Sequence, residues 1–154
     1  MKLVSCFKAG IGLDLPGGQS QEVIFGEVGR AIAEASGLGD EAAAALREAF
    51  LEREAAGTTA FGFGVAIPHV FHPDLSGVIV AAVRLERGIE MGAMDGVETR
   101  FLICVAAPEQ ERELYLSLLQ HVAHTVRDRR YRSFIEQSPS AAGILDVLVE
   151  ARDV

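Results

Sequence analysis

Apolar runs of membrane-spanning length and cysteine motifs are both missing from this sequence. No stretch approaches the roughly 18 uninterrupted apolar residues of a transmembrane helix, so we expect no membrane insertion. The two cysteines, Cys6 and Cys104, lie in apolar contexts and share no short spacing with each other or with a histidine pair. This usage favours a reduced, cytoplasmic protein. Internal repeats and long linkers are also missing, which predicts one domain over residues 1–154.

Basic residues are scarce as well. The chain has 14 lysine and arginine residues against 22 aspartate and glutamate residues, a formal net charge of −8. Nucleic acids and anionic membranes bind mainly through lysine and arginine, so we expect neither as the main partner. A local basic patch, Arg127-Asp128-Arg129-Arg130, is interpreted as the exposed end of a helix, where cations interact favourably with the helix dipole.

Hydrophobic periodicity predicts four helices. Apolar residues recur every three or four positions in segments bounded by capping residues or glycines. The helices are expected from Ser20 to Gly37, from a cap at Asp40 to Gly57, from about Glu109 to Arg127, and after a cap at Ser138 or Ser140. Residues 131–136 are expected to form a short turn.

Extended segments are expected at the N-terminus and in the middle of the chain. Residues 2–7 and 11–15 are short apolar pieces separated by glycine, and 78–85 and 100–107 are continuous apolar runs that predict strands covered on both faces. Residues 88–97, with an Asp95-Gly96 turn signal, predict a short strand and hairpin. The order of elements predicts an α/β fold, a three-layer sandwich with a central mixed β-sheet of about five strands flanked by helices.

Residues 53–69 concentrate the unusual chemistry of the chain. Arg53 lies in the last turn of a predicted helix, and a pair of hydroxyl side chains, Thr58 and Thr59, follows the end of that helix. Gly62 and Gly64 allow backbone to approach a ligand closely. A guanidinium beside such a loop is well suited to a phosphate or a carboxylate.

A histidine closes this stretch in a rigid setting. Pro68 has a fixed φ and pushes Ile67 towards extended geometry, so His69 is expected at the end of a short strand with little freedom. Together with Arg53, this arrangement predicts a site at which a histidine handles an anion.

Nucleotide and metal sites are weaker interpretations of the same stretch. Gly62-Phe63-Gly64 lacks the third glycine of a dinucleotide fingerprint and the lysine of a phosphate loop, and it precedes a strand. His69 and His72 have zinc spacing only if they are helical, and prolines flank them, although Asp74 offers a third ligand.

The remaining histidines are better explained as structural. His121 and His124 lie three residues apart on the predicted long helix, and His124 points away from its apolar stripe. We therefore expect both to be exposed or half-buried.

Four segments resemble the fructose, mannitol and nitrogen-regulatory class of phosphotransferase-system enzyme IIA proteins. They are Leu51-Glu52-Arg53-Glu54, Gly57-Thr58-Thr59, Gly62-Phe63-Gly64-Val65-Ala66-Ile67-Pro68-His69 and Ala106-Ala107-Pro108-Glu109. The order and spacing of the likeness extend from near the N-terminus to about Val149. The Ala-Ile-Pro-His motif behind Gly-x-Gly is its most specific part.

The resemblance implies a single α/β domain that works as a phosphocarrier of the transferase class. His69 would accept a phosphoryl group from the phosphorylated histidine phosphocarrier protein, then pass it to an enzyme IIB or hold it as a regulatory mark. Arg53, Thr58 and Thr59 are the candidates for stabilising the transferred oxygens. The resemblance implies no cofactor and no metal.

One position departs from the family pattern. Members usually carry a second active-site histidine at the start of the long helix, and the matching residue here is Tyr115. Two main function classes follow: a phosphocarrier in a transfer chain, of nitrogen-regulatory or fructose type, and a regulatory binding module without a sugar-transport role, switched by phosphorylation or independent of it. A metal hydrolase using His69 and His72 is the weaker third alternative.

Overall fold

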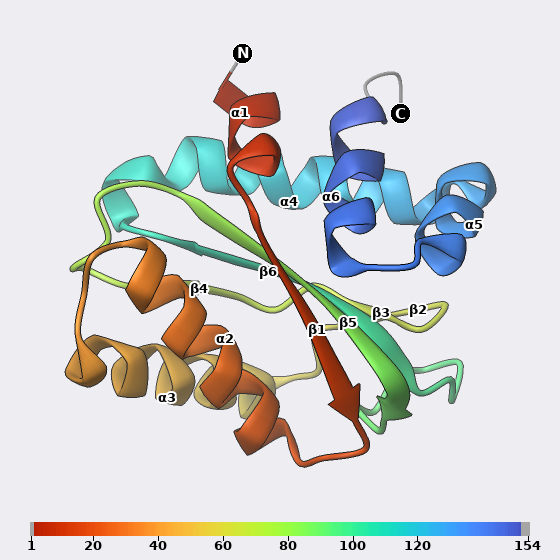
Figure 1. Cartoon of the computed structure of the whole chain (residues 1–154), viewed down its shortest axis with the longest axis horizontal. Coiled ribbons are helices and arrows are strands. Elements are labelled where there is room, and N and C mark those ends of the chain that lie inside the picture. The colour runs from red at the N-terminus through yellow and green to blue at the C-terminus, as the bar shows by residue number, and fades with distance from the viewer. Residues whose placement is uncertain (1, 152–154) are drawn as a thin grey trace.

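The computed structural model describes residues 2–151 and places one β-sheet between two layers of helices (Figure 1). The helices are α1 Lys2–Lys8, α2 Gln21–Ala35, α3 Asp40–Ala56, α4 Arg112–Arg127, α5 Arg129–Gln137 and α6 Ala141–Glu150, with a 3-10 turn at Glu109–Glu111. The strands are β1 Ile11–Gly17, β2 Ala60–Gly62, β3 Val65–Ala66, β4 His69–Phe71, β5 Ile79–Ile89 and β6 Thr99–Ala107. The predicted α/β sandwich is therefore confirmed, with a sheet of six strands where about five were expected.

The sheet is mixed, as predicted. Its strands follow the order β1-β5-β6-β3-β2, and β4 also pairs with β6. β5 and β6 are antiparallel, and so are β2 and β3. β1 runs parallel to β5, while β3 and β4 both run parallel to β6.

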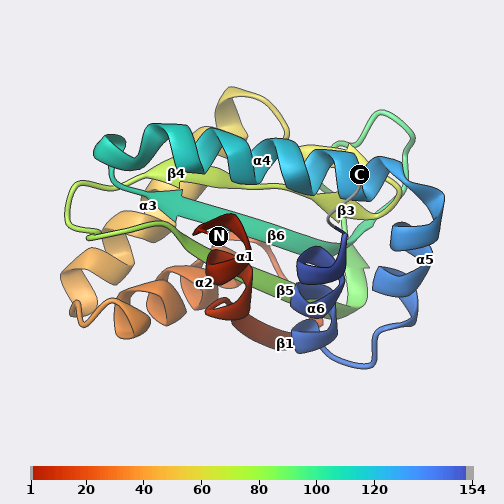
Figure 2. The same ribbon diagram turned by 90° about the horizontal axis from the view of Figure 1, so that it is seen from above.

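The two central strands are buried on both faces. Val80 and Val105 face the core that α1, α4 and α6 cover, whereas Ala81 and Cys104 face the core that α2 and α3 cover. Figure 2 shows α1, α4 and α6 gathered over one side of the sheet. This double burial confirms the prediction from the continuous apolar runs, because each successive side chain enters an apolar layer.

β3 and β4 lie end to end along the same edge of β6. Val65 pairs with Phe101 and His69 pairs with Val105, so the register is unchanged across the two residues between the strands. The carbonyl of Pro68 accepts a hydrogen bond of 2.9 Å from the N–H of Val105. His69 is thus the first residue of β4 and not the end of a strand, as was expected, and it is held there by the sheet and by the preceding proline.

The four helices predicted from periodicity are present as α2, α3, α4 and α6. Ser20 caps α2 as predicted, accepting a bond from a backbone N–H of the first turn. Asp40 is the first residue of α3 rather than its cap, which is Gly39. At the start of α6 the side chain of Ser140 makes no capping bond, and Asp14 of β1 accepts a hydrogen bond from the first N–H instead.

No helix within residues 2–151 is long and apolar enough to span a membrane.

Residues 2–7 form a helix, so the extended segment expected there was wrong. Phe7 is completely buried, and its ring lies 5.4 Å from that of His121. Leu3, one turn earlier, packs against the same core. In so short a segment an apolar pattern fits a strand or a helix equally well, and packing against α4 and α6 decides between them.

Two further expectations were wrong, the second of them only in part. Residues 131–136 belong to α5, which Asp128 caps by accepting a bond of 2.9 Å from the N–H of Arg130 and which buries Ile135 completely. Residues 88–97 contain no separate strand, because β5 continues to Ile89. The expected turn is present, since the N–H of Gly96 donates a bond of 3.0 Å to the carbonyl of Ala93 in the loop that joins the antiparallel strands β5 and β6.

Candidate functional site

The His69 ring is fixed by a hydrogen bond to its own backbone segment. Its Nδ1 lies 2.7 Å from the carbonyl oxygen of Ile67. In a neutral imidazole Nδ1 is then the protonated nitrogen, and the lone pair is on Nε2. Nε2 has no hydrogen-bond partner within residues 2–151. The backbone therefore sets both the orientation and the tautomer of a ring that can act as a nucleophile.

The surroundings of His69 favour its neutral form. Partial burial lowers the pKa of the imidazole below 6.5, because withdrawal from water disfavours the charged ring. The bond to Ile67 and the charge of Glu54 oppose this shift, while the positive charge of Arg53 adds to it. At neutral pH the imidazole is therefore uncharged, as attack on phosphorus requires.

His69 lies at the junction of two surface hollows. The first is lined by Arg53, Thr58 and Thr59 together with apolar side chains of β2 and α4. The second is lined by Arg53, Phe71 and Tyr115. Arg53 and His69 line both hollows, so the two residues that the sequence singled out first lie together.

Arg53 is held in place at the end of α3. Its Nη1 donates a hydrogen bond of 2.8 Å to the carbonyl oxygen of Gly57. Within the described chain its other N–H groups have no acceptor. The guanidinium is thus anchored by one edge and can offer the remaining donors to an anion beside His69.

Both threonine hydroxyls are engaged within the protein. The Thr58 hydroxyl donates to the carbonyl of Met91 and accepts a bond of 3.0 Å from the N–H of Ala60. The Thr59 hydroxyl donates to the carboxylate of Glu54. The structure brings both threonines to the first hollow, with their hydroxyl protons directed at protein acceptors.

Glu54 is the residue whose part in the site the sequence analysis missed. Its side chain is buried, and its two oxygens accept bonds from the hydroxyl and the backbone N–H of Thr59. A carboxylate is rarely buried unless such partners satisfy it. Glu54 thereby ties the last turn of α3 to the loop that enters β2. The available signal was an acid directly after Arg53, five residues before a threonine.

Tyr115 faces the second hollow from the first turn of α4. Its ring centroid lies 6.1 Å from that of His69 and 4.3 Å from that of Phe71. Burial raises the pKa of the phenol, and the charges of Arg53 and Arg112 only partly oppose that rise. Tyr115 is therefore neutral at physiological pH and can donate one hydrogen bond without adding charge.

The other histidines do not join the site. His72 is buried, and its Nδ1 accepts a bond of 3.2 Å from the N–H of Asp74. His121 binds a backbone carbonyl of α6 and is half-buried, while His124 is exposed. Within residues 2–151 no group of three histidine, cysteine or carboxylate side chains is arranged to hold a metal ion. The metal hydrolase built on His69 and His72 therefore has no metal site in this part of the chain.

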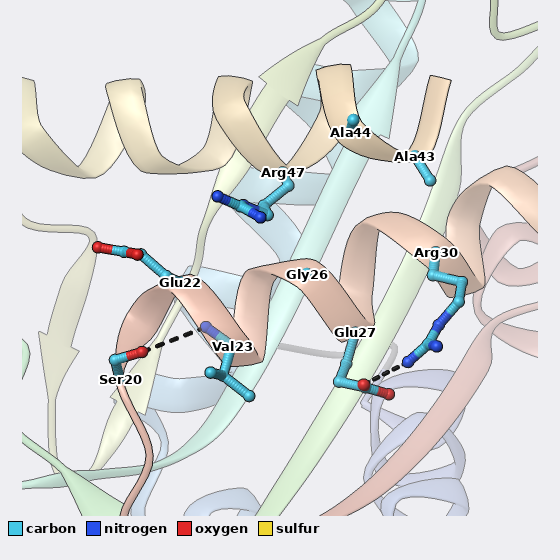
Figure 3. A pocket seen from close by; sticks show the side chains of 9 residues that line it. All are labelled: Ser20, Glu22, Val23, Gly26, Glu27, Arg30, Ala43, Ala44 and Arg47. Atoms are coloured by element: carbon cyan, nitrogen blue, oxygen red, sulfur yellow. Dashed lines mark hydrogen bonds and ion pairs between the residues drawn. The ribbon is translucent and has the colours of Figure 1, made fainter. Parts of the chain in front are cut away.

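A separate hollow lies between α2 and α3 (Figure 3). Arg30 pairs there with Glu27, and Arg47 lies 3.4 Å from Glu48. Ser20, on the same rim, is engaged in capping α2. Within the described residues Glu22 makes no ion pair and the buried Nε of Arg47 has no hydrogen-bond partner, but neither histidine nor cysteine lines this hollow. We therefore place the candidate site at His69.

A known protein family and individual proteins resemble this chain in sequence. Residues 10–151 match the family model described as phosphoenolpyruvate-dependent sugar phosphotransferase system, EIIA 2. A nitrogen regulatory protein of Bradyrhizobium diazoefficiens is 36% identical over 104 residues, which cover 68% of each chain. The fructose-specific EIIA component of a phosphotransferase system from Haloferax volcanii is 33% identical over 115 residues, 75% of this chain and 74% of the relative.

Solved structures share the fold. The nitrogen regulatory protein IIA-Ntr of Neisseria meningitidis superposes with a TM-score of 0.82 at 25% identity, over 96% of this chain and 99% of the other. The mannitol enzyme IIA of Escherichia coli, solved in complex with its phosphorylated enzyme IIB, gives a TM-score of 0.65 at 18% identity, over 89% and 94% of the two chains.

Proposed function

The chain belongs to the EIIA 2 family of the phosphoenolpyruvate-dependent sugar phosphotransferase system, and we propose that it accepts a phosphoryl group on Nε2 of His69. The observation that carries this proposal is the hydrogen bond from Nδ1 to the Ile67 carbonyl, which leaves the lone pair on Nε2 beside Arg53. The donor is the phosphorylated histidine phosphocarrier protein. Residues 1–154 act as one domain in this reaction.

The transfer needs no proton to leave the acceptor ring. The lone pair on Nε2 attacks phosphorus while the phosphorus–nitrogen bond of the donor phosphohistidine breaks. A donor ring that carries a proton on its other nitrogen leaves as a neutral imidazole, and His69 keeps its own proton on Nδ1. What remains for the protein is positioning and the stabilisation of charge on the transferred oxygens.

Arg53 is the side chain best suited to that stabilisation. Its fork offers several N–H donors in one plane, which matches two oxygens of a phosphoryl group. Its bond to Gly57 keeps the guanidinium in place before the phosphoryl group arrives. A contact prepared in this way costs little reorganisation during transfer.

Thr58 and Thr59 have a less direct part in the proposal. To contact a transferred oxygen, each hydroxyl must first leave its present acceptor, Met91 or Glu54. Their present bonds support a role in holding the loop that borders the hollow. The alternative is a direct contact between a threonine hydroxyl and the phosphoryl group. Substitution of each threonine by valine distinguishes these two roles.

We propose further that phosphorylated His69 serves mainly as a regulatory mark. The observation that favours this is the neutral phenol of Tyr115 beside His69, which adds no positive charge to help phosphoryl exchange. The name of the Bradyrhizobium relative is consistent with regulation. An enzyme IIB is the first recipient to test, given the complex of the mannitol proteins, and a regulated protein target is the alternative partner.

Intact-mass measurement after incubation with phosphoenolpyruvate, enzyme I and the histidine phosphocarrier protein tests the proposal. The expected product is a single acid-labile phosphoryl group, mapped to His69 by peptide analysis. Adding an enzyme IIB from the same genome then separates the two outcomes, because a relay loses its label within the time of labelling and a mark keeps it. A chain that stays unlabelled with an active donor overturns the proposed function.

A further inference from the structure

We propose that Arg112 supplies a second positive charge to the phosphoryl group on His69. This inference rests on the proposed function, since it concerns the group that His69 would carry. A phosphoryl group bears between about one and a half and two negative charges at neutral pH. Among the residues that line the two hollows, Arg53 is the one permanent cation, and one of its N–H groups is already bonded to Gly57. One arginine balances about one of these charges, so the lining residues leave roughly a third to a half of the charge of the phosphoryl group unmatched.

Arg112 does not line the second hollow itself but lies against Phe71, which does. Its guanidinium carbon is 4.8 Å from the centre of the Phe71 ring, which packs 4.3 Å from the Tyr115 ring. Arg112 and Tyr115 are three residues apart on α4 and share one side of that helix. Phe71 follows His69 by two residues on β4 and therefore shares its side of the sheet.

The guanidinium of Arg112 is available to an anion. Within residues 2–151 it makes no hydrogen bond and no ion pair, although Glu109, Glu111 and Glu113 are its neighbours in sequence. The guanidinium lies over the Phe71 ring, a contact that does not use its N–H groups as donors to another side chain. The side chain is thus ordered by an aromatic ring and still free to donate.

The charge of Arg112 acts on the hollow. Burial raises the pKa of Tyr115, and Arg53 and Arg112 are the two charges that oppose the rise. Both therefore act on the phenol that borders His69. They come from α3 and α4, which cover opposite faces of the sheet (Figure 1). A phosphoryl group between these layers would meet one arginine from each.

The test compares Arg112→Gln with Arg130→Gln as a matched control. Arg130 is also exposed and also lies over an aromatic ring, Tyr131, at 5.4 Å. Neither Arg130 nor Tyr131 lines the hollows at His69. Each substitution removes one exposed positive charge and one guanidinium that lies over an aromatic ring, so an effect of net charge alone appears in both variants. Arg130→Gln also removes the ion pair with Asp128, the cap of α5, and thermal unfolding of both variants reports any loss of stability.

Labelling of His69 is measured with two donors, the phosphorylated histidine phosphocarrier protein and the small molecule phosphoramidate. The phosphoramidate reaction needs no protein docking. We expect Arg112→Gln to slow labelling by about three- to tenfold with both donors, the size suited to one exposed charge-assisted contact, and Arg130→Gln to match wild type. Arg112→Lys should fall between them, because it keeps the charge and loses the planar guanidinium.

The outcomes separate the inference from the proposed function. If wild type takes no label on His69 from either donor, the proposed function fails. If wild type is labelled and Arg112→Gln is slower only with the protein donor, Arg112 is a docking residue and the inference is wrong. Equal rates for wild type and Arg112→Gln with both donors also overturn it, and so does an equal loss in Arg130→Gln.

Discussion

The ring of Tyr115 stands at 65° to the ring of His69, with 6.1 Å between their centroids. A phenol from α4 and an imidazole from β4 thus border one hollow, although 46 positions separate them in the chain. Both side chains are uncharged at neutral pH, and the imidazole offers a nucleophilic nitrogen at that pH. The hollow thus combines a reactive ring with a neutral hydrogen-bond donor.

Replacing His69 by alanine should abolish labelling by the histidine phosphocarrier protein. Nε2 of His69 is the nucleophile in the proposed transfer, and the other described histidines lie outside the two hollows. Intact-mass measurement gives the readout, and His124→Ala, at an exposed site on α4, is the control that should label normally. Label on His72 or His124 in the His69→Ala protein would show that the acceptor is assigned wrongly.

The protonation of His69 should have its midpoint below pH 6.5. Burial and the charge of Arg53 lower the pKa of the ring, so the neutral form persists to more acidic pH than in an exposed histidine. The labelling rate should therefore begin to decline at a lower pH than it would for a histidine with an unshifted pKa. Arg53→Gln removes one cause of the shift and should move the midpoint upward. The His69 ring resonances, followed by NMR titration, measure it, and a wild-type midpoint above 6.5 contradicts the expectation.

Arg53→Ala should slow labelling much more than it lowers the melting temperature. A preorganised donor that acts mainly in the transition state contributes on the order of 2–4 kcal/mol to the barrier. The lost bond to Gly57 is a single contact near the surface, worth about 1 kcal/mol. Single-turnover labelling and thermal unfolding of the same samples compare the two effects. Arg53→Lys should recover only part of the rate, since it lacks the fork, and unchanged labelling in Arg53→Ala would remove Arg53 from the mechanism.

Thr59→Val should be a stability variant more than a transfer variant. The substitution leaves one oxygen of the buried Glu54 carboxylate without its hydroxyl donor, which costs about 1–3 kcal/mol. Thr58→Val loses the bond to Met91 at a more exposed position and should cost less. Denaturant unfolding and the labelling rate are measured side by side. A large loss of rate at unchanged stability would instead place that hydroxyl on the phosphoryl group.

The parts of the fold that the sequence predicted are those with a long or unambiguous pattern. β5 and β6 are continuous apolar runs, and α2 and α4 repeat their apolar face over several turns. α1 and α5 are only seven and nine residues long, so their patterns fit more than one structure. Their helical form depends on burying Phe7 and Ile135 against distant elements, and no local rule contains that information.

The candidate site divides in a similar way. His69 and Arg53 could be picked out because proline, glycines and a helix end mark them in one short stretch. The bond from Nδ1 of His69 to Ile67 and the burial of Glu54 depend on how β4 and α3 meet. Arg112 lies far from that stretch in sequence, and its relation to His69 exists only through the packing of Phe71 against α4.

Tyr115→His should speed phosphoryl exchange without changing the site of labelling. An imidazole in the first turn of α4 would border the same hollow as His69 and could carry a positive charge next to the phosphoryl group, which the phenol does not. Exchange of labelled His69 with unlabelled histidine phosphocarrier protein, or with an enzyme IIB, gives the rate, and Tyr115→Phe is the control that removes the hydroxyl without adding a charge.

The gain in Tyr115→His should be larger at pH 6 than at pH 8. A histidine with an ordinary pKa near 6.5 is mostly charged at the lower value and neutral at the higher one. In wild type, Tyr115 should add no such pH dependence to the exchange rate. Burial raises the pKa of the phenol above its usual value, so the group is neutral at both pH values. A long-lived phosphohistidine suits a signal better than a relay. If wild type already exchanges as fast as Tyr115→His at both pH values, the neutral phenol does not slow discharge and the argument for regulation loses its main support.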